Sequence, residues 1–159
     1  MIAVKIARRG LILLVLLVCC LSFSPALAQR KPCPVGGFSL DLPDSFTEQP
    51  LSGEAPDLCF NWKSDRLSIQ AYVLYLGEVA GSDLFQVLTG SETDSGTASW
   101  GGVNMLYASG VDAGGAYRLY SWMDRGNNVT LYFYYTEGDA SAPGIINDIM
   151  GTISFDAGH

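Results

Sequence analysis

The chain has 159 residues, with nine Lys and Arg, sixteen Asp and Glu, and a single His. The first 28 residues hold three of the basic residues and no acid, so residues 29–159 carry six basic and sixteen acidic side chains, a charge of −10. That charge argues against nucleic acid as a partner bound through its phosphates, while an apolar share of about 43% in residues 29–159 excludes a disordered chain and suits one folded domain.

The N-terminus has the three parts of a secretory signal peptide. Basic residues at positions 5, 8 and 9 precede an unbroken apolar run at 11–21, and Ser24-Pro25 then leads into Ala26-Leu27-Ala28. Small residues at positions 26 and 28 suit a signal peptidase, so we expect residues 1–28 to be removed by cleavage between Ala28 and Gln29. Residues 29–159 then form a single secreted or periplasmic (extracytoplasmic) domain, with no stable transmembrane span after processing.

Alternatives to this processing remain open. An uncleaved anchor is disfavoured because a bilayer span needs roughly 20 apolar residues. Lipid attachment at Cys19 or Cys20 is the second alternative, although Val18 is bulkier than the residue that lipoprotein processing prefers. Arg8-Arg9 resembles a twin-arginine signal only superficially.

Two cysteines remain after cleavage, Cys33 and Cys59. An exported chain meets an oxidising compartment, so this pair predicts a disulfide. Two separate buried thiols are the alternative. A zinc site is not expected, because two cysteines without a nearby His do not fill a tetrahedral shell.

The next segments show the alternation of apolar and polar residues that is typical of strands. Residues 38–42 alternate strictly and end at Pro43, and residues 43–57 are rich in Pro and acids, which predicts a surface loop. Residues 58–62 resume the strand pattern, and Ser64-Asp65 turns the chain into a strand at 67–76. This last strand becomes apolar on both faces, which predicts a central place in the sheet.

A helix, a loop and three more strands follow in the pattern. Ser82 is a helix N-cap candidate before an apolar stripe at 84–88, and residues 90–99 are Gly, Ser, Thr and acids, which predicts a loop. After a glycine turn at 100–102, strands are expected at 103–108, 116–123 and 129–136. Short connections make these three an antiparallel meander.

The chain is expected to close with a helix and a short extended segment. Ser141 is a candidate N-cap and Pro143 fits the first turn. Ile145, Ile146, Ile149 and Met150 give the helix an apolar face, and Gly151 ends it. Residues 153–155 then run extended.

This order of elements resembles the PsbP/Mog1-like superfamily. The resemblance is carried by Phe-Ser-Leu-Asp-Leu-Pro at 38–43, by the order of strands and helices, and by Ile-Ile-Asn-Asp-Ile-Met-Gly-Thr-Ile-Ser-Phe at 145–155. It covers residues 36–156, the expected core. It implies an α+β fold, a twisted antiparallel sheet of about six strands flanked by two helices. The superfamily has no shared catalytic motif, and its members range from photosystem subunits to envelope lipoproteins.

The residue types for catalysis are largely missing. The single His is the last residue, His159, which excludes Ser-His-Asp and Cys-His mechanisms. Lys31 and Lys63 are the lysines beyond the signal segment, and neither lies in a Ser-x-x-Lys motif. We therefore expect a protein that is not an enzyme and holds no metal or other cofactor.

Two local motifs resemble functional sites. Residues 92–96 have calcium-ligand residue types but lack the spacing and the final Glu of an EF-hand. Asn128-Val129-Thr130 is a glycosylation sequon at the start of an expected strand, which we interpret as structural.

Aromatic residues crowd the last two strands of the meander. Alternation places Tyr120, Trp122, Tyr132 and Tyr134 on one face, opposite residues such as Leu131 and Phe133. These rings favour cross-strand packing. If exposed, the same four rings would form a ligand face for a glycan or an apolar compound.

Three functions follow from these observations. The first is a non-catalytic exported accessory or binding protein, with an unknown protein or glycan partner in the envelope or outside the cell. The second is a binder of carbohydrate or a small apolar ligand through the aromatic face. The third is a small carboxylate-dependent hydrolase, which needs two acids roughly 5–10 Å apart in one cleft. The sequence leaves the ligand, the oligomeric state and release or retention in the envelope open.

Overall fold

The computed structural model describes residues 28–51, 53, 57–75 and 92–156. These residues form ten strands and one helix. In chain order they are β1 (Gln29–Cys33), β2 (Phe38–Leu42), β3 (Thr47–Glu48), β4 (Leu58–Lys63), β5 (Leu67–Tyr75), β6 (Glu92–Trp100), β7 (Val103–Asp112), β8 (Gly115–Asp124), β9 (Asn127–Tyr135), α3 (Ala142–Met150) and β10 (Ser154–Phe155). Within these ranges, no helix has the length and apolar character needed to cross a bilayer.

The strands form two antiparallel sheets rather than one. Seven strands pair in the order β3-β4-β5-β9-β8-β7-β6, and three pair in the order β1-β2-β10. The prediction of about six strands and two helices is therefore only partly correct: the described residues are mostly strand, with a single helix. The predicted helix that begins near Ser82 lies outside the described residues.

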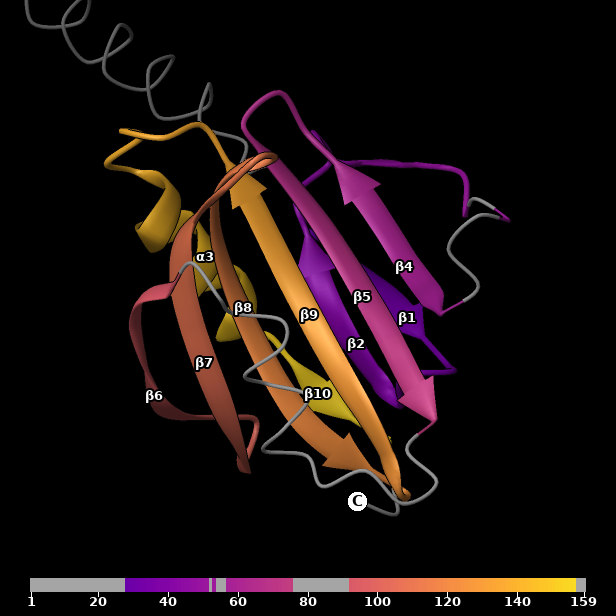
Figure 1. Cartoon of the computed structure of the whole chain (residues 1–159). Helices are drawn as coiled ribbons and strands as arrows, with labels where there is room; N and C mark the ends of the chain where they lie inside the picture. Colours follow the sequence, from indigo (N-terminus) through magenta and orange to yellow (C-terminus); the bar gives the residue numbers. More distant parts are fainter. Residues whose placement is uncertain (1–27, 52, 54–56, 76–91, 157–159) are drawn as a thin grey trace, which may run out of the picture.

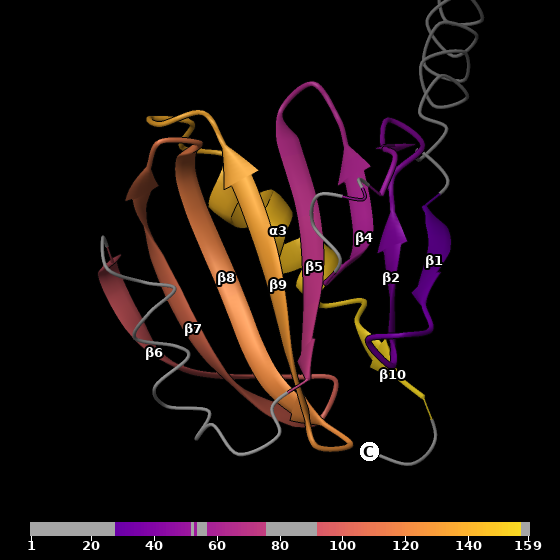
Figure 2. The ribbon, with the colours of Figure 1, turned by 45° about the vertical axis from the view of Figure 1, so that its right-hand side comes forward.

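The small sheet and α3 lie on the same side of the seven-stranded sheet (Figures 1 and 2). We call the side they cover the inner face and the opposite side the outer face. Strand β2 lies in the middle of the small sheet and buries Phe38, Leu40 and Leu42 against the main core. Helix α3 adds Ile146, Ile149 and Met150 to the same core. Figure 1 shows none of the described helices or strands in front of the outer face.

Several strand predictions are confirmed. The predicted strands at 38–42 and 58–62 correspond to β2 and β4. Strand β5 lies between β4 and β9, as its two apolar faces indicated. Strands β7, β8 and β9 form the antiparallel meander, and residues 154–155 form the short strand β10.

The prediction of a loop at 90–99 is wrong. Residues Glu92–Trp100 form β6, the edge strand, which pairs with β7 alone. An edge strand draws its hydrogen bonds from one neighbour and leaves much of its surface in water, so it tolerates Ser, Thr and acids where a central strand does not. A polar edge also discourages pairing with other chains.

Strand β1 was not predicted either. Its residues include Arg30, Lys31 and Pro32, and proline is confined to sheet edges because it lacks an N–H. Strand β1 is such an edge, paired along its whole length with β2. The Arg30 guanidinium ties it to the rest of the small sheet: it lies 2.9 Å from the Asp41 carboxylate and donates to the Thr152 carbonyl and the Ser154 hydroxyl.

The turn between β6 and β7 requires glycine for two different reasons. Gly101 and Gly102 both have positive φ, +56° and +82°. A Cβ on Gly101 would lie 2.9 Å from the carbonyl oxygen of Ile153 and 3.0 Å from the ring of Phe155, whereas a Cβ on Gly102 would meet nothing within 4 Å. Gly101 is therefore a point of contact between the two sheets.

This difference gives a stability prediction with a matched control. We expect Gly102→Ala to cost about 1 kcal/mol, the strain of positive φ alone. Gly101→Ala adds a collision with backbone and should cost about 2–3 kcal/mol. Urea unfolding of both variants measures the difference, and equal losses would show that the contact with Ile153 and Phe155 does not matter.

Candidate functional site

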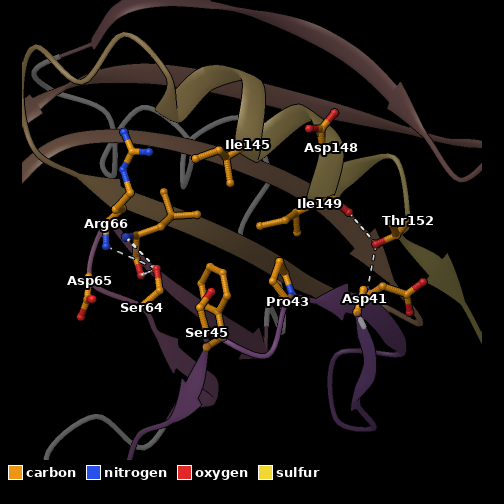
Figure 3. A pocket seen from close by; sticks show the side chains of 13 residues that line it. Asp41, Pro43, Ser45, Ser64, Asp65, Arg66, Ile145, Asp148, Ile149 and Thr152 are labelled. Atoms are coloured by element: carbon orange, nitrogen blue, oxygen red, sulfur yellow. Dashed lines mark hydrogen bonds between the residues drawn. The ribbon is translucent and has the colours of Figure 1, made fainter. Parts of the chain in front are cut away.

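A cleft of about 530 Å³ opens between α3, the segment that follows β2, and the β4–β5 turn. Figure 3 shows Ile145 and Ile149 pointing from the helix toward Pro43. The β4–β5 turn closes one end of the cleft, and Asp41 and Thr152 lie at the other end. Sequence reasoning did not find this site, because its residues come from four separate segments.

The apolar floor follows from the period of the helix. Ile145 and Ile149 are four residues apart and so share one face of α3. Ile149 is buried, while Ile145 is only half-buried and keeps part of its surface in the cleft. Opposite the helix, a hydrogen bond of 3.0 Å from Phe46 N–H to the Pro43 carbonyl folds the chain so that both residues line the cleft.

The β4–β5 turn is held by the Ser64 side chain. The Ser64 hydroxyl accepts hydrogen bonds from the N–H groups of Arg66 (3.4 Å) and Leu67 (3.1 Å), and Ser64 N–H donates to the Leu67 carbonyl at 2.8 Å. Serine is common at such turns for this reason. The predicted turn at Ser64-Asp65 is confirmed. These hydrogen bonds fix the backbone of the turn and so position the side chains of Asp65 and Arg66.

Arg66 joins this turn to the start of α3. Its Nη2 lies 2.9 Å from both carboxylate oxygens of Asp139 and donates to the Ser141 hydroxyl. Asp139 also accepts hydrogen bonds from the Ser141 hydroxyl and backbone N–H, at 2.7 and 3.0 Å. These bonds, with the ion pair to Arg66, hold the pKa of Asp139 below its ordinary value.

Ser141 stands at the N-cap of α3, as predicted, but it does not cap the helix with its side chain. Its hydroxyl is engaged by Asp139 and Arg66 instead. The residue thus anchors the helix start to the β4–β5 turn. Gly151 forms the C-cap as expected, and its N–H donates to the carbonyl of Asn147.

The polar groups at the other end of the cleft are also engaged. Asp41 is paired with Arg30. The Thr152 hydroxyl donates to the Ile149 carbonyl at 2.7 Å and accepts from Asp41 N–H at 2.9 Å. Asp65 and Asp148 are exposed acids on the rim, and Figure 3 shows Asp148 pointing away from the apolar centre.

This arrangement suits binding better than acid–base chemistry. A carboxylate-dependent hydrolase needs one carboxyl group with a raised pKa to act as the acid. The pKa of Asp139, beside the cleft, is lowered instead of raised, and the Asp41 carboxylate is paired with Arg30. The cleft instead offers an apolar floor with exposed charged side chains around it, Asp65, Arg66 and Asp148.

The structure brings the predicted disulfide cysteines together without a bond between them. The Cys33 and Cys59 sulfurs lie 3.3 Å apart, one in β1 and the other in β4. Cys59 lies at the irregularity where the β4–β5 register shifts, between Leu58 and Phe60. A β-bulge at that point redirects a side chain, and Cys59 packs on the main core on the same side as Phe60.

The two thiols are unequal. The hydrogen bond from Cys59 lowers the pKa of Cys33, and the same contact, together with burial, raises the pKa of Cys59. The disulfide itself remains a prediction.

The predicted aromatic face is wrong in its parity. Tyr120 pairs with Leu131, and both belong to the main core beneath the inner face, as does Trp122. Tyr132 and Tyr134 lie on the outer face, because they pair with Leu119 and Tyr117. The prediction places even-numbered residues of β8 and β9 on the same face of the sheet. The observed register instead pairs each even-numbered residue of β8 with an odd-numbered residue of β9.

The outer face carries its own tyrosine cluster, made of Tyr72, Tyr117, Tyr132 and Tyr134. The rings of Tyr132 and Tyr134 are stacked 5.7 Å apart, and Tyr72 meets Tyr132 edge-on at 5.8 Å. Tyr117 and Tyr132 are nevertheless buried, at 2% and 8% exposed. Burial raises the pKa of Tyr132, and it raises that of Tyr134 to about 12. This packing is what cross-strand pairing predicts. Tyr72, Tyr132 and Tyr134 also line a hollow of about 280 Å³ on this face.

The two local motifs also have clear placements. Asn128 of the sequon is buried, and its amide nitrogen donates to the Ser121 hydroxyl at 2.9 Å, so the folded chain does not present it. Residues 92–96 belong to β6. Among the described residues, no three His, Cys, Asp or Glu side chains converge as metal ligands would.

The Arg66–Asp139 pair predicts a pH dependence. A carboxyl group whose pKa is lowered by folding stabilises the fold above its unfolded pKa, near 4, and loses that contribution as pH falls through the folded value. We expect Asp139→Asn to melt at a lower temperature than the parent at pH 7, with the difference shrinking below about pH 4. Melting curves of both proteins from pH 7 to pH 2 measure it. A difference that stays constant with pH would exclude the ion pair as its cause.

A second prediction concerns the cysteine pair. Exported protein should contain the Cys33–Cys59 disulfide, which non-reducing peptide mapping detects. Closing the loop between residues 33 and 59 should stabilise the fold by about 3–4 kcal/mol relative to the reduced protein. Labelling of both thiols in exported material by an alkylating agent, without prior reduction, would contradict the prediction. The predicted cleavage between Ala28 and Gln29 is read in the same experiment from the N-terminal peptide.

Sequence comparison finds no match to any protein-family model and none to a curated protein. Structural comparison does find similar folds. Cyanobacterial PsbP (CyanoP) from Synechocystis sp. PCC 6803 is similar with a TM-score of 0.63 at 9% identity, over 84% of this chain and 95% of that one. LpqN, a protein involved in cell envelope biogenesis of Mycobacterium tuberculosis, is similar with a TM-score of 0.51 at 14% identity, over 85% and 87%.

A protein from Bacteroides thetaiotaomicron VPI-5482 is similar over 83% of this chain and 50% of its own, with a TM-score of 0.55 at 12% identity. Identities this low establish the arrangement of elements and nothing of the chemistry. The resemblance of the element order to PsbP-like proteins is thereby confirmed in three dimensions: the chain has a PsbP-like fold.

Proposed function

We propose that this protein is a non-catalytic accessory or binding protein that acts outside the cytoplasm and uses the α3 cleft to hold a partner. The observation that carries the proposal is the contrast between the floor and the edge of the cleft. The floor is apolar, and several polar groups around it are already committed to bonds within the fold. Side chains that are hydrogen-bonded or ion-paired within the fold keep the cleft in shape, but they are poorly placed to transfer protons to a substrate.

The partner we propose is a protein segment that is both apolar and cationic. Asp65 and Asp148 stand on the rim, and residues 29–159 carry a net charge of −10. A positive segment is therefore attracted at long range, and its apolar side chains replace water on Ile145 and Pro43. The extracytoplasmic location rests on the signal-like N-terminus, with support from LpqN, whose fold is similar and which is involved in cell envelope biogenesis.

The glycan-binding alternative loses its original basis, because the four rings proposed for it lie on two faces of the sheet. The hydrolase alternative gains no support from the cleft, where Asp41 is paired with Arg30. Neither alternative is favoured by a specific observation at this cleft.

A charge-reversal experiment tests the proposal. The probe is a fluorescent helical peptide of leucine and lysine, and its counterpart has glutamate at every lysine. We expect the lysine peptide to bind the protein of residues 29–159 and the glutamate peptide not to bind. Asp148→Lys should weaken the lysine peptide about threefold to tenfold, since exposed charge pairs contribute modestly.

The matched control is Asp156→Lys, an exposed position after β10 that does not line the cleft and has the same charge change. It should leave binding nearly unchanged. A second variant, Ile145→Ser, removes apolar surface from the cleft floor and should weaken binding at every salt concentration. Equal effects of Asp148→Lys and Asp156→Lys, or binding of both peptides alike, would overturn the cleft as the binding site.

A further inference from the structure

The hollow on the outer face lies over β5 and β9. Its volume is about 280 Å³, and five uncharged side chains line it: Tyr72, Leu74, Thr130, Tyr132 and Tyr134. Figure 1 shows β5 and β9 side by side in front of the small sheet. The hollow therefore lies on the opposite side of the seven-stranded sheet from the α3 cleft.

The strand register explains why these side chains meet. Tyr72 pairs with Thr130 across β5 and β9. Side chains two residues apart on a strand share a face, so Leu74 lies beside Tyr72 on one strand, and Tyr132 and Tyr134 follow Thr130 on the other. Two neighbouring strands thus bring three tyrosine rings to one place, although β5 and β9 are far apart in the sequence.

The three rings have two orientations around the hollow. The planes of Tyr132 and Tyr134 are 5° apart, whereas the planes of Tyr72 and Tyr132 are 88° apart. Tyr132 is 8% exposed, while Tyr72 and Tyr134 are half-buried and keep part of their ring surface open. Rings arranged in this way can place more than one aromatic surface against the same small ligand.

Hydrogen bonds hold the two outer rings in place. The Tyr72 hydroxyl donates to Gln70 Oε1 at 3.1 Å, and the Tyr134 hydroxyl donates to Asp112 Oδ2 at 3.5 Å. The other oxygen of Asp112 accepts from Gly114 N–H at 2.7 Å, which fixes the carboxylate. A site whose side chains are already ordered loses less entropy when a ligand binds.

The charges at this hollow favour a cation. The face of an aromatic ring carries negative potential, which attracts a positive charge placed over it. The exposed Asp112 carboxylate lies beside Tyr134, and after burial it is the next cause of the raised pKa of that tyrosine, about 12, so its negative charge acts on the ring.

No described positive side chain lines the hollow. The adjoining hollow, which shares Tyr134, has two positive and two negative side chains, whose charges cancel: Lys63, Arg66, Asp65 and Glu137. Residues 29–159 as a whole carry a charge of −10. A positive ligand is therefore attracted at long range and an anion is repelled.

We propose that this hollow binds a small organic cation of the quaternary ammonium type. The methyl groups on its nitrogen pack against Leu74 and the ring carbons, and its charge lies against the tyrosine rings. A metal ion suits the site less well, because it requires oxygen ligands and none of the five lining side chains is a carboxylate. A primary ammonium is also less suitable, because it is strongly hydrated.

A pair of probes of the same shape tests the charge. The first is choline, and the second is its neutral carbon analogue, in which a tert-butyl group replaces the trimethylammonium group. Glucose is a third probe, for a sugar ring. Isothermal titration calorimetry and the ligand-induced rise in melting temperature are measured on the protein of residues 29–159. We expect choline to bind with a Kd at or below about 1 mM, and the neutral analogue and glucose to bind at least tenfold more weakly.

Three variants locate the binding. Tyr72→Leu removes a ring but keeps an apolar side chain, and it should weaken choline about threefold to tenfold. Tyr72→Phe keeps the ring and should change the Kd less than about twofold. Tyr107→Leu makes the same change at a half-buried tyrosine of the inner face and should have no effect.

Each other outcome would overturn the proposal: no binding of choline, equal binding of choline and its neutral analogue, preference for glucose, or equal losses from Tyr72→Leu and Tyr107→Leu. If Tyr72→Leu does not fold, Tyr134→Leu takes its place, and the comparison of the probes on the unmodified protein still decides. The test is independent of the proposed function, because the α3 cleft shares no lining residue with this hollow.

Discussion

The rest of the structure depends on covering one apolar face of the seven-stranded sheet. The inner face presents Ile69, Leu131 and Phe133, all fully buried, and no single helix of nine residues is broad enough to cover seven strands. The chain solves this with two covers, α3 and the small sheet. Strand β2 is common to both, because it is the middle of the small sheet and also contacts α3.

Because two separate elements, α3 and the small sheet, cover the inner face, hollows remain beside them. The α3 cleft lies between the helix and the β2 side of the small sheet, where Pro43 and Thr152 belong to the segments that lead away from β2 and α3. A smaller cavity lies where Asn147 of α3 faces β6, β7 and β8.

The sequence predicted the parts of the fold that depend on local pattern. The strict alternation at 38–42, the two apolar faces of the predicted strand at 67–76 and the short turns of the meander each depend on neighbouring residues only. The structure confirms strand β2, the central place of β5 and the meander. Strand β6 was missed because an edge strand is paired on one side only, so its Ser, Thr and acidic residues lack the apolar signature. The parity of β8 and β9 was missed because the register across a turn depends on the turn geometry, here with φ of +48° at Arg125 and +82° at Gly126.

The candidate sites were beyond the reach of sequence reasoning for a similar reason. Arg66 and Ser141 are 75 residues apart, and only the packing of α3 against the β4–β5 turn brings them together. Alternation alone predicts that Tyr120 shares a face with Tyr132, whereas Tyr120 lies on the inner face and lines a cavity with Trp100 and Arg118. Both faces of the sheet carry aromatic clusters, and Arg118 distinguishes this cavity from the outer face. The tyrosines of the outer face pair with one another across β5, β8 and β9.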